Sequence, residues 1–322
     1  MTTHTVAVID DFHPNSMQTI KNGLPSDWRI EIANAHDPAD VKRVLGQADV
    51  LFIMGKGMSA AMLEQAPRLK FIQKLGAGVD NIDAQACQAR GIVLAKLQGG
   101  NAVPVAEHTL LMTLATLRRL PQLDRETRRG EWVRERARTV SRQLSEKTVG
   151  IVGFGAIGKA YAQLLTGFGA KVIYYDLVQA PDEVCARLNA TFVELDTLLA
   201  TADIISLHVP LTELTRHMIA ARELGLMQKH AVLINCARGG VVDEAALTEA
   251  LEQQTIHGAG IDVFHNEPTH ASNPLFALDN CVVTPHTAGG TVDNFENVVR
   301  KAVENVKRLD QGQAFEPGDR VV

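Results

Sequence analysis

The sequence predicts an α/β protein built from two doubly wound parallel-sheet domains. Three observations predict this class. Short apolar segments alternate with helical segments, a G-x-G-x-x-G motif follows one of the apolar segments, and 322 residues suffice for two domains. With 46% apolar and 21% charged residues, the composition is that of an ordinary globular protein.

The first hundred residues contain four apolar segments that predict strands, at residues 5–10, 50–54, 69–75 and 92–97. The segments at 38–47 and 60–66 lie between successive strands and predict the crossover helices of a parallel sheet. A dense apolar segment at 99–120 predicts a largely buried helix linking the two domains, with Asn101 as N-cap and Pro104 in the first turn.

A second series of strands begins at residue 148. The segments that predict them are residues 148–153, 171–176, 203–209, 231–237, 258–264 and 281–286. Helical segments separate most of these strands, so this half also predicts a parallel sheet covered by helices. Apolar residues at helical spacing predict a closing helix at 296–312.

The composition limits which binding partners and which cellular compartment we expect for the protein. A net charge of −5 gives no reason to expect nucleic acid or anionic lipid as a partner, and no apolar run is long enough to span a bilayer. Four scattered cysteines without a CxxC pair favour a reducing compartment and predict no metal site. Because a strand segment starts at Thr5, we expect no signal peptide and a cytoplasmic protein.

Residues 118–147 carry the one marked charge bias, with ten Lys or Arg side chains against five acidic ones. A solvated helix-and-loop face explains such a segment. The alternatives are a subunit interface and a funnel for anions, and the sequence leaves all three interpretations open.

The sharpest local signal is Gly153-Phe-Gly155-Ala-Ile-Gly158, which follows a strand segment and opens a helical one. The first glycine permits a tight turn, the second lets the backbone approach a pyrophosphate, and the third permits close packing of helix on strand. The helix N-terminus attracts phosphate. Asp176 ends the next strand and is placed to accept from a ribose 2′-hydroxyl, so the motif predicts NAD rather than NADP.

Polar residues also end the later strands of this half, namely His208 with Pro210, Arg238, Asp262 and His286. A lone histidine after a strand is often structural, and a lone aspartate often caps a turn. Ligands of open α/β sheets bind at the carboxyl ends of the strands, so these residues together predict a functional edge.

The residue types indicate hydride transfer to a 2-keto acid. Arg238 offers the planar fork that matches a carboxylate. His286 is a natural proton donor, because an imidazole titrates near neutral pH. A nearby carboxylate favours the imidazolium form, and Glu267 in the segment HNEP is the candidate, with a surface turn residue as the alternative.

With these residues identified, the sequence resembles the D-isomer-specific 2-hydroxyacid dehydrogenase family over essentially its whole length. The matching stretches are LGAGVDNID (75–83), GFGAIGKA (153–160), HVPLT (208–212), NCARGGVVDEAAL (235–247), GIDVFHNEP (260–268) and TPHTAGGT (284–291). The resemblance implies a Rossmann nucleotide domain at 103–288, inserted in a flavodoxin-like substrate domain formed by 1–102 and 289–322. The two domains flank a cleft in that family.

The resemblance also implies site residues. Arg238, Glu267 and His286 match the catalytic residues, Asp262 matches the aspartate near the nicotinamide, and Gly76-Ala77-Gly78 matches the loop whose amides hold the substrate carboxylate. Positions that usually contact NAD are occupied by Ala156, Ile157, Asp176, Thr212 and Ala237. The family is typically dimeric through its nucleotide domains, which favours the interface interpretation for part of 118–147.

The motifs are most similar to the phosphoglycerate dehydrogenase and hydroxypyruvate/glyoxylate reductase branch, and Glu267 argues against a formate dehydrogenase. Since the chain stops soon after the closing helix, we expect no regulatory tail domain. Lys56 follows a strand and would meet a substrate phosphate, a second carboxylate or only solvent. The predicted activity is interconversion of small 2-keto and D-2-hydroxy acids with NAD. The alternatives are an NAD-sensing protein similar to the C-terminal binding corepressors, and phosphite oxidation.

Overall fold

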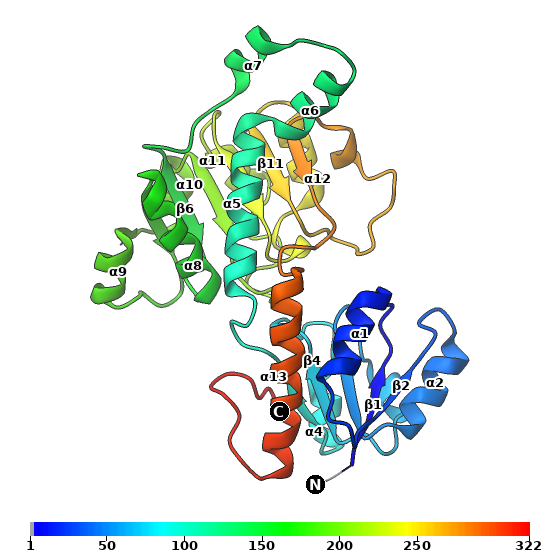
Figure 1. Ribbon diagram of the computed structural model, residues 1–322. Helices are drawn as coiled ribbons and strands as arrows, with labels where there is room; N and C mark the ends of the chain where they lie inside the picture. The colour runs from blue at the N-terminus through cyan, green and yellow to red at the C-terminus, as the bar shows by residue number, and fades with distance from the viewer. Residues whose placement is uncertain (1–2) are drawn as a thin grey trace. The chain divides into compact units, whose positions relative to one another are not determined.

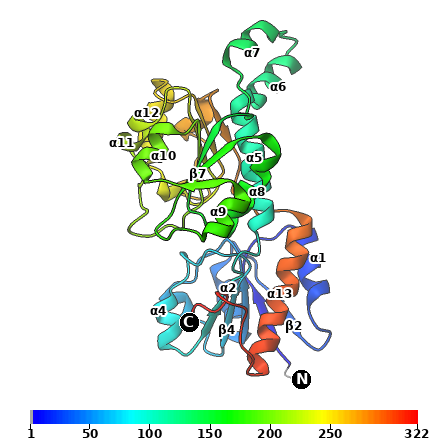
Figure 2. The ribbon, with the colours of Figure 1, turned by 90° about the vertical axis from the view of Figure 1, so that its left-hand side faces the viewer.

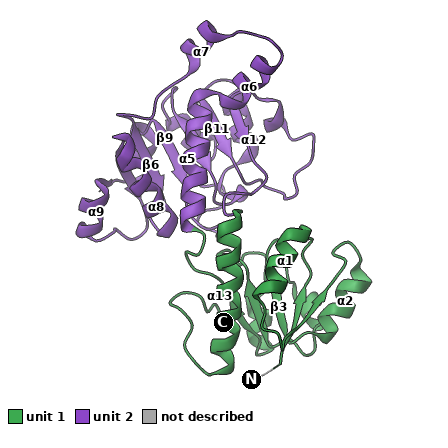
Figure 3. Cartoon of the chain, viewed as in Figure 1, with its two compact units in different colours: residues 1–101, 290–322 green, residues 102–289 purple. Residues whose placement is uncertain are grey.

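The protein, described as a computed structural model over residues 3–322, divides into two compact units (Figure 3). Unit 1 comprises Met1–Asn101 and Gly290–Val322, and unit 2 comprises Ala102–Gly289. Unit 2 is therefore inserted in the chain of unit 1. No helix of residues 3–322 is both long and apolar enough to cross a membrane.

Unit 1 is a five-stranded parallel sheet with the strand order β2-β1-β3-β4-β5, the flavodoxin-like order. Its strands are β1 (Thr5–Val8), β2 (Arg29–Ile32), β3 (Val50–Ile53), β4 (Phe71–Lys74) and β5 (Val93–Ala95). Helices cover both faces: α1 (Pro14–Gly23) and α13 (Val292–Asp310) pack on one, and α2 (Pro38–Gln47), α3 (Ala60–Glu64) and α4 (Ala84–Ala89) on the other.

Unit 2 is a seven-stranded parallel sheet with the order β8-β7-β6-β9-β10-β11-β12 (Figure 1). Its strands are β6 (Thr148–Val152), β7 (Lys171–Tyr175), β8 (Ala190–Phe192), β9 (Ile204–Leu207), β10 (Val232–Asn235), β11 (Gly258–Ile261) and β12 (Cys281–Val283). The order reverses between β6 and β9, which is where a doubly wound sheet binds its ligand.

Helices also cover both faces of the sheet in unit 2 (Figure 2). One face is covered by α5 (Ala102–Arg118), α8 (Ala156–Leu165) and α9 (Asp182–Leu188), and the other by α10 (Leu195–Thr201), α11 (Ala221–Leu226) and α12 (Glu244–Glu252). Three short 3₁₀ turns complete the unit, at Thr166–Phe168, Gly239–Val241 and Pro274–Ala277.

The predicted fold class is confirmed, with three local differences. β2 and β8 were not predicted: β2 has no fully buried residue and β8 has one, so neither shows an apolar segment. Asn101 directly precedes α5, as predicted for an N-cap, but its Oδ1 is buried and accepts no hydrogen bond within residues 3–322, so its side chain does not cap the helix. Pro104 does lie in the first turn of α5.

The charge-biased segment 118–147 forms an arm that projects from the sheet of unit 2 and contains α6 (Leu120–Arg128) and α7 (Arg134–Val140) (Figures 1 and 2). Half of its ten basic side chains form ion pairs, namely Arg125–Asp279, Arg128–Asp124, Arg134–Glu135, Arg136–Glu126 and Arg138–Glu135. This pairing removes much of the charge that a funnel for anions would need. Trp132, between the two helices, is 83% exposed.

Candidate active site

The glycine motif forms the turn between β6 and α8, and the contacts of its glycines differ. Gly153 has a φ of 93°, and a Cβ there would lie 2.7 Å from the carbonyl oxygen of His208 on β9's exit loop. A Cβ at Gly158 would lie 2.2 Å from the Gly153 carbonyl oxygen. A Cβ at Gly155 would meet no atom within 4 Å, so packing does not require glycine there.

The first turn of α8 is suited to binding phosphate. Gly155 is its N-cap and provides no side-chain cap, so protein side chains leave the first amides of the helix open to an anion. Ala156 and Ile157 are the first two residues of this helix. These features fit the pyrophosphate of a dinucleotide.

Asp176 directly follows β7, beside the glycine turn. Its Oδ2 accepts from the amide of Phe154 at 2.7 Å, and its Oδ1 accepts from the amide of Leu177 at 2.7 Å. The carboxylate therefore holds the glycine turn in place. Each oxygen keeps a second lone pair, so Asp176 also retains the capacity to accept from a ribose hydroxyl.

His208 directly follows β9, but its imidazole turns into the protein. Nε2 lies 2.9 Å from Ser206 Oγ, and Nδ1 is buried without a hydrogen-bond partner within residues 3–322. Burial lowers the pKa of His208 to about 3, so the ring is neutral at physiological pH. His208 therefore presents its backbone to the sheet edge. Pro210 and Thr212 are exposed on the loop that follows.

Arg238 is positioned by a residue that we did not single out from the sequence. Asn235, the last residue of β10, is buried; its Oδ1 accepts from the amide of Ala237 and its Nδ2 donates to the carbonyl of Arg238, both at 3.0 Å. Arg238 Nη1 donates to the Ala237 carbonyl at 2.7 Å. A buried amide at the end of an otherwise apolar strand is the signal that could have identified Asn235.

His286 and Glu267 lie together at the same edge of the sheet. His286 Nδ1 is 2.6 Å from Glu267 Oε2, and Glu267 Oε1 accepts from the amide of Phe264 at 2.9 Å. Burial raises the pKa of Glu267, but these hydrogen bonds and the positive charge of Arg238 outweigh it and hold the pKa below its ordinary value. Glu267 is therefore ionised at neutral pH, and its carboxylate contacts the His286 ring.

Asp262 follows β11 and binds the turn that carries His286. Its side chain is fully buried, and Oδ1 accepts from the Thr287 amide at 2.9 Å while Oδ2 accepts from the Ala288 amide at 3.0 Å. The amide of His286 donates to the Asp262 carbonyl at 2.7 Å. Burial raises the pKa of Asp262, but its hydrogen bonds, the first from His108, outweigh this and lower it. Asp262 is thus an ionised clamp for the turn.

In unit 1, Gly76, Ala77 and Gly78 follow β4 in a partly exposed turn. Lys56 lies on the loop after β3, where its ammonium donates to the carbonyl of Ala35. The amides of this loop donate to the buried carboxylate of Asp10, which makes three such contacts of 2.7–2.8 Å with residues 54–56. Asp10 was missed as a loop-ordering residue, although it ends the first predicted strand.

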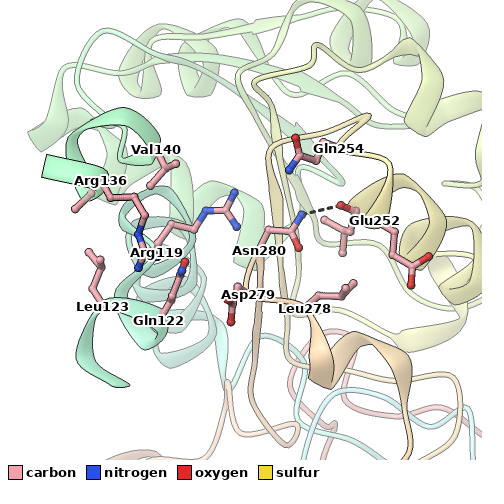
Figure 4. A pocket seen from close by; sticks show the side chains of 12 residues that line it. Arg119, Gln122, Leu123, Arg136, Val140, Glu252, Gln254, Leu278, Asp279 and Asn280 are labelled. Atoms are coloured by element: carbon pink, nitrogen blue, oxygen red, sulfur yellow. Dashed lines mark hydrogen bonds between the residues drawn. The ribbon is translucent and has the colours of Figure 1, made fainter. Parts of the chain in front are cut away.

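Residues 3–322 contain no group of three or more potential metal ligands of the His, Cys, Asp or Glu type. A cavity of about 330 Å³ lies between the arm and the body of unit 2 (Figure 4). Arg119, Gln122, Arg136, Asp279 and Asn280 are among its lining residues. Since Asp279 and Asn280 precede β12, this cavity lies at the amino-terminal edge of the sheet, away from the residues described above.

Comparison with known proteins places the chain in a family. Residues 110–288 match the D-isomer specific 2-hydroxyacid dehydrogenase, NAD binding domain. A glyoxylate reductase of Thermococcus litoralis is 40% identical over 257 residues, covering 78% of this chain and 77% of that protein. A D-3-phosphoglycerate dehydrogenase of Methanocaldococcus jannaschii is 35% identical over 97% of this chain, which spans only 58% of that relative.

A solved structure gives the same result. The D-lactate dehydrogenase of Aquifex aeolicus, complexed with NAD and lactic acid, superposes with a TM-score of 0.84 at 29% identity and covers 99% of both chains. The two parallel-sheet α/β units agree with these matches. The chain therefore belongs to the D-isomer specific 2-hydroxyacid dehydrogenase family and contains that family's NAD-binding domain.

Proposed function

We propose that this chain is an NAD-dependent dehydrogenase that interconverts small 2-keto acids and D-2-hydroxy acids. The observation that carries the proposal is the His286–Glu267 contact of 2.6 Å, at the sheet edge that also bears the glycine motif and Arg238. Reduction of a keto acid requires three protein groups: a proton donor, a carboxylate that stabilises the protonated donor, and a guanidinium that binds the substrate carboxylate.

The dinucleotide would be held by the turn between β6 and α8, by Asp176 and by the exit loop of β9. The amides at Gly155, Ala156 and Ile157 would bind the pyrophosphate, and Asp176 the adenosine ribose. Backbone groups of His208 and Pro210, with Thr212, Ala237 and Asp262, complete the proposed contacts. Bound NADH supplies the hydride.

The remaining chemistry belongs to side chains of the protein. Arg238 would bind the substrate carboxylate through its planar fork. His286 would hold a proton on the ring nitrogen opposite its Glu267 contact and transfer it to the carbonyl oxygen. Glu267 would orient the ring and stabilise its charge. The amides of Gly76, Ala77 and Gly78 would also bind the carboxylate, a role that rests on the family resemblance.

The test is oxidation of NADH and NADPH in the presence of hydroxypyruvate, glyoxylate, pyruvate, phosphohydroxypyruvate and longer 2-keto acids. We expect turnover with NADH and at least one small acid. Tight NADH binding without turnover of any acid would favour a sensor of the corepressor type, and phosphite oxidation would favour the other alternative. A preference for phosphohydroxypyruvate would indicate that Lys56 binds phosphate.

Replacing Asp176 with serine is expected to reduce the preference for NADH over NADPH by roughly tenfold or more, because the carboxylate that repels a 2′-phosphate is removed. The measurement is kcat/KM for both cofactors with the best acid. Asp182→Asn, which alters an exposed carboxylate in α9, is the matched control. An unchanged ratio in Asp176→Ser would contradict the proposed ribose contact.

We also propose a homodimer joined through unit 2, with the arm at the interface. Exposed apolar residues support it: Val103 and Leu111 lie eight residues apart on α5, and Leu120 and Trp132 belong to the arm. Trp132→Glu is expected to shift the protein from dimer to monomer in light scattering, since burying a charge in an apolar interface is costly. Leu214→Glu alters an equally exposed apolar side chain outside the arm and should leave the mass unchanged. A monomeric wild-type protein would refute the dimer.

The proposed partners are thus a small acid and a second copy of the chain. The net charge of −5 is the reason to expect neither nucleic acid nor a membrane surface. The proposed compartment is the cytoplasm, and it is supported by four cysteines that are all free.

A further inference from the structure

We propose that His108 is a positioning residue for His286. It acts through Thr284 on the carboxylate of Asp262, which binds the turn that presents His286. The inference rests on the proposed function of His286 as the proton donor. His108 lies on α5, far in sequence from the turn, and nothing in its sequence surroundings indicates this role.

The turn that presents His286 depends on Asp262. His286 has a φ of 54°, a left-handed conformation that non-glycine residues rarely adopt without support. The support comes from the Asp262 carbonyl, which accepts from the His286 amide at 2.7 Å, and from the Asp262 carboxylate, which accepts from both following amides. An Asp262 side chain that rotated away would release this turn.

Three contacts tie the Asp262 carboxylate to α5. Thr284 Oγ1 lies 2.6 Å from Asp262 Oδ1, His108 Nε2 lies 3.1 Å from Thr284 Oγ1, and His108 Nε2 lies 3.6 Å from Asp262 Oδ1. The side chain of His108 is 15% exposed and that of Asp262 is not exposed. Solvent therefore cannot replace His108 easily, and the buried carboxylate depends on protein donors.

Counting hydrogens fixes the direction of these bonds. Two oxygens 2.6 Å apart need a hydrogen between them, and an ionised carboxylate has none, so the Thr284 hydroxyl donates to Asp262. That hydroxyl has a single hydrogen, so towards His108 it accepts. His108 must then carry a proton on Nε2, where it also faces the negative charge of Asp262.

Of the groups near Asp262, His108 supplies the ring N–H that contacts both Thr284 and the carboxylate. Cys236 is the other titratable neighbour, and burial followed by the negative charge of Asp262 raises the pKa of its thiol to about 12, so it stays neutral. At the other end of the turn, Glu267 contacts the His286 ring, and the positive charge of Arg238 acts on Glu267. The position of His286 is thus set by Glu267 at its ring and by the His108–Thr284–Asp262 chain at its backbone.

The test compares His108→Leu, which cannot donate, with His108→Gln, whose amide can donate to Thr284. We expect His108→Leu to lower kcat/KM for keto-acid reduction roughly tenfold, as loss of a buried hydrogen-bond donor to Thr284 predicts. The basic limb of its pH–rate profile should move to lower pH, because a loosened turn weakens the His286–Glu267 contact. NADH affinity, measured by fluorescence, should change far less. His108→Gln should restore most of the activity and the profile.

Two further measurements keep the outcome decisive. Long-range proton–nitrogen NMR of the histidine rings should show a proton on Nε2 of His108, and the His286 signals should move in both His108→Leu and Thr284→Val. His36→Leu makes the same change on a side chain that is 80% exposed and should move none of these observables. If His108→Leu fails to fold, Thr284→Val and His108→Gln carry the comparison.

Different results would overturn the positioning role of His108 and the proposed function. An unchanged pH profile and unchanged His286 signals in folded His108→Leu or Thr284→Val would overturn the positioning role. A wild-type protein that reduces no 2-keto acid would overturn the proposed function, while the NMR comparison would still decide whether His108 orders the turn.

Discussion

Replacing His286 with alanine is expected to lower turnover in 2-keto acid reduction roughly 10²–10⁴-fold, the usual contribution of a positioned general acid. The structure gives the physical reason: Glu267 contacts Nδ1 of His286 at 2.6 Å and so orients the ring at the sheet edge. The measurement is steady-state kcat with saturating NADH, together with the NADH dissociation constant, which should change little.

His265→Ala is the matched control for this substitution. His265 is an exposed histidine on the same loop as Glu267, and its removal should leave kcat unchanged. Reduction by the wild-type protein should also slow as pH rises, because the imidazolium loses the proton it must donate, and oxidation should show the opposite trend. Wild-type turnover in His286→Ala would remove this residue from the mechanism.

Replacing Arg238 with alanine is expected to lower kcat/KM for keto acids about 10²–10³-fold, as the loss of a preorganised charge contact predicts. NAD affinity should be largely spared, because the proposed dinucleotide contacts other than Ala237 lie on other turns. Asn235 holds the backbone around Arg238 with two hydrogen bonds of 3.0 Å, so the turn itself should persist. Both constants are measured on the same protein sample.

Two comparison variants sharpen the Arg238 result. Arg238→Lys keeps the charge but loses the planar fork, so it should recover only part of the activity. Arg216→Ala removes an exposed arginine from the loop after β9 and should behave like the wild-type protein. Loss of NAD binding in Arg238→Ala would show that this side chain contacts the cofactor rather than the acid.

Much of the fold follows from the sequence, and the reason is local. Fully apolar segments such as 232–234 predict central strands, because both faces of a central strand are buried. The glycine turn could also be predicted from the sequence, since its three glycines, the preceding strand and the following helix are contiguous. The edge strands β2 and β8 escaped prediction because little of their surface is buried.

The candidate site follows from the sequence only in its residue types. The sequence shows that Arg238, Glu267 and His286 match motifs of one family. Their catalytic roles remain predictions. The inward orientation of the His208 ring could not be predicted, because the sequence pattern of a polar residue after a strand is the same whether it faces a ligand or the core. The ion pairs that offset part of the arm's basic charge could not be predicted either.

The sequence by itself determined where most strands lie along the chain, the position of the glycine turn and the family, because each is encoded in contiguous residues. Only the tertiary structure decided that Asp262 clamps the turn of His286 and that His108 joins that clamp. His108 and Thr284 are 176 residues apart, and no local pattern records which buried donor meets which buried acceptor. Packing α5 against β11 and β12 brings them together, and the cost of leaving a buried carboxylate without donors then fixes their contact.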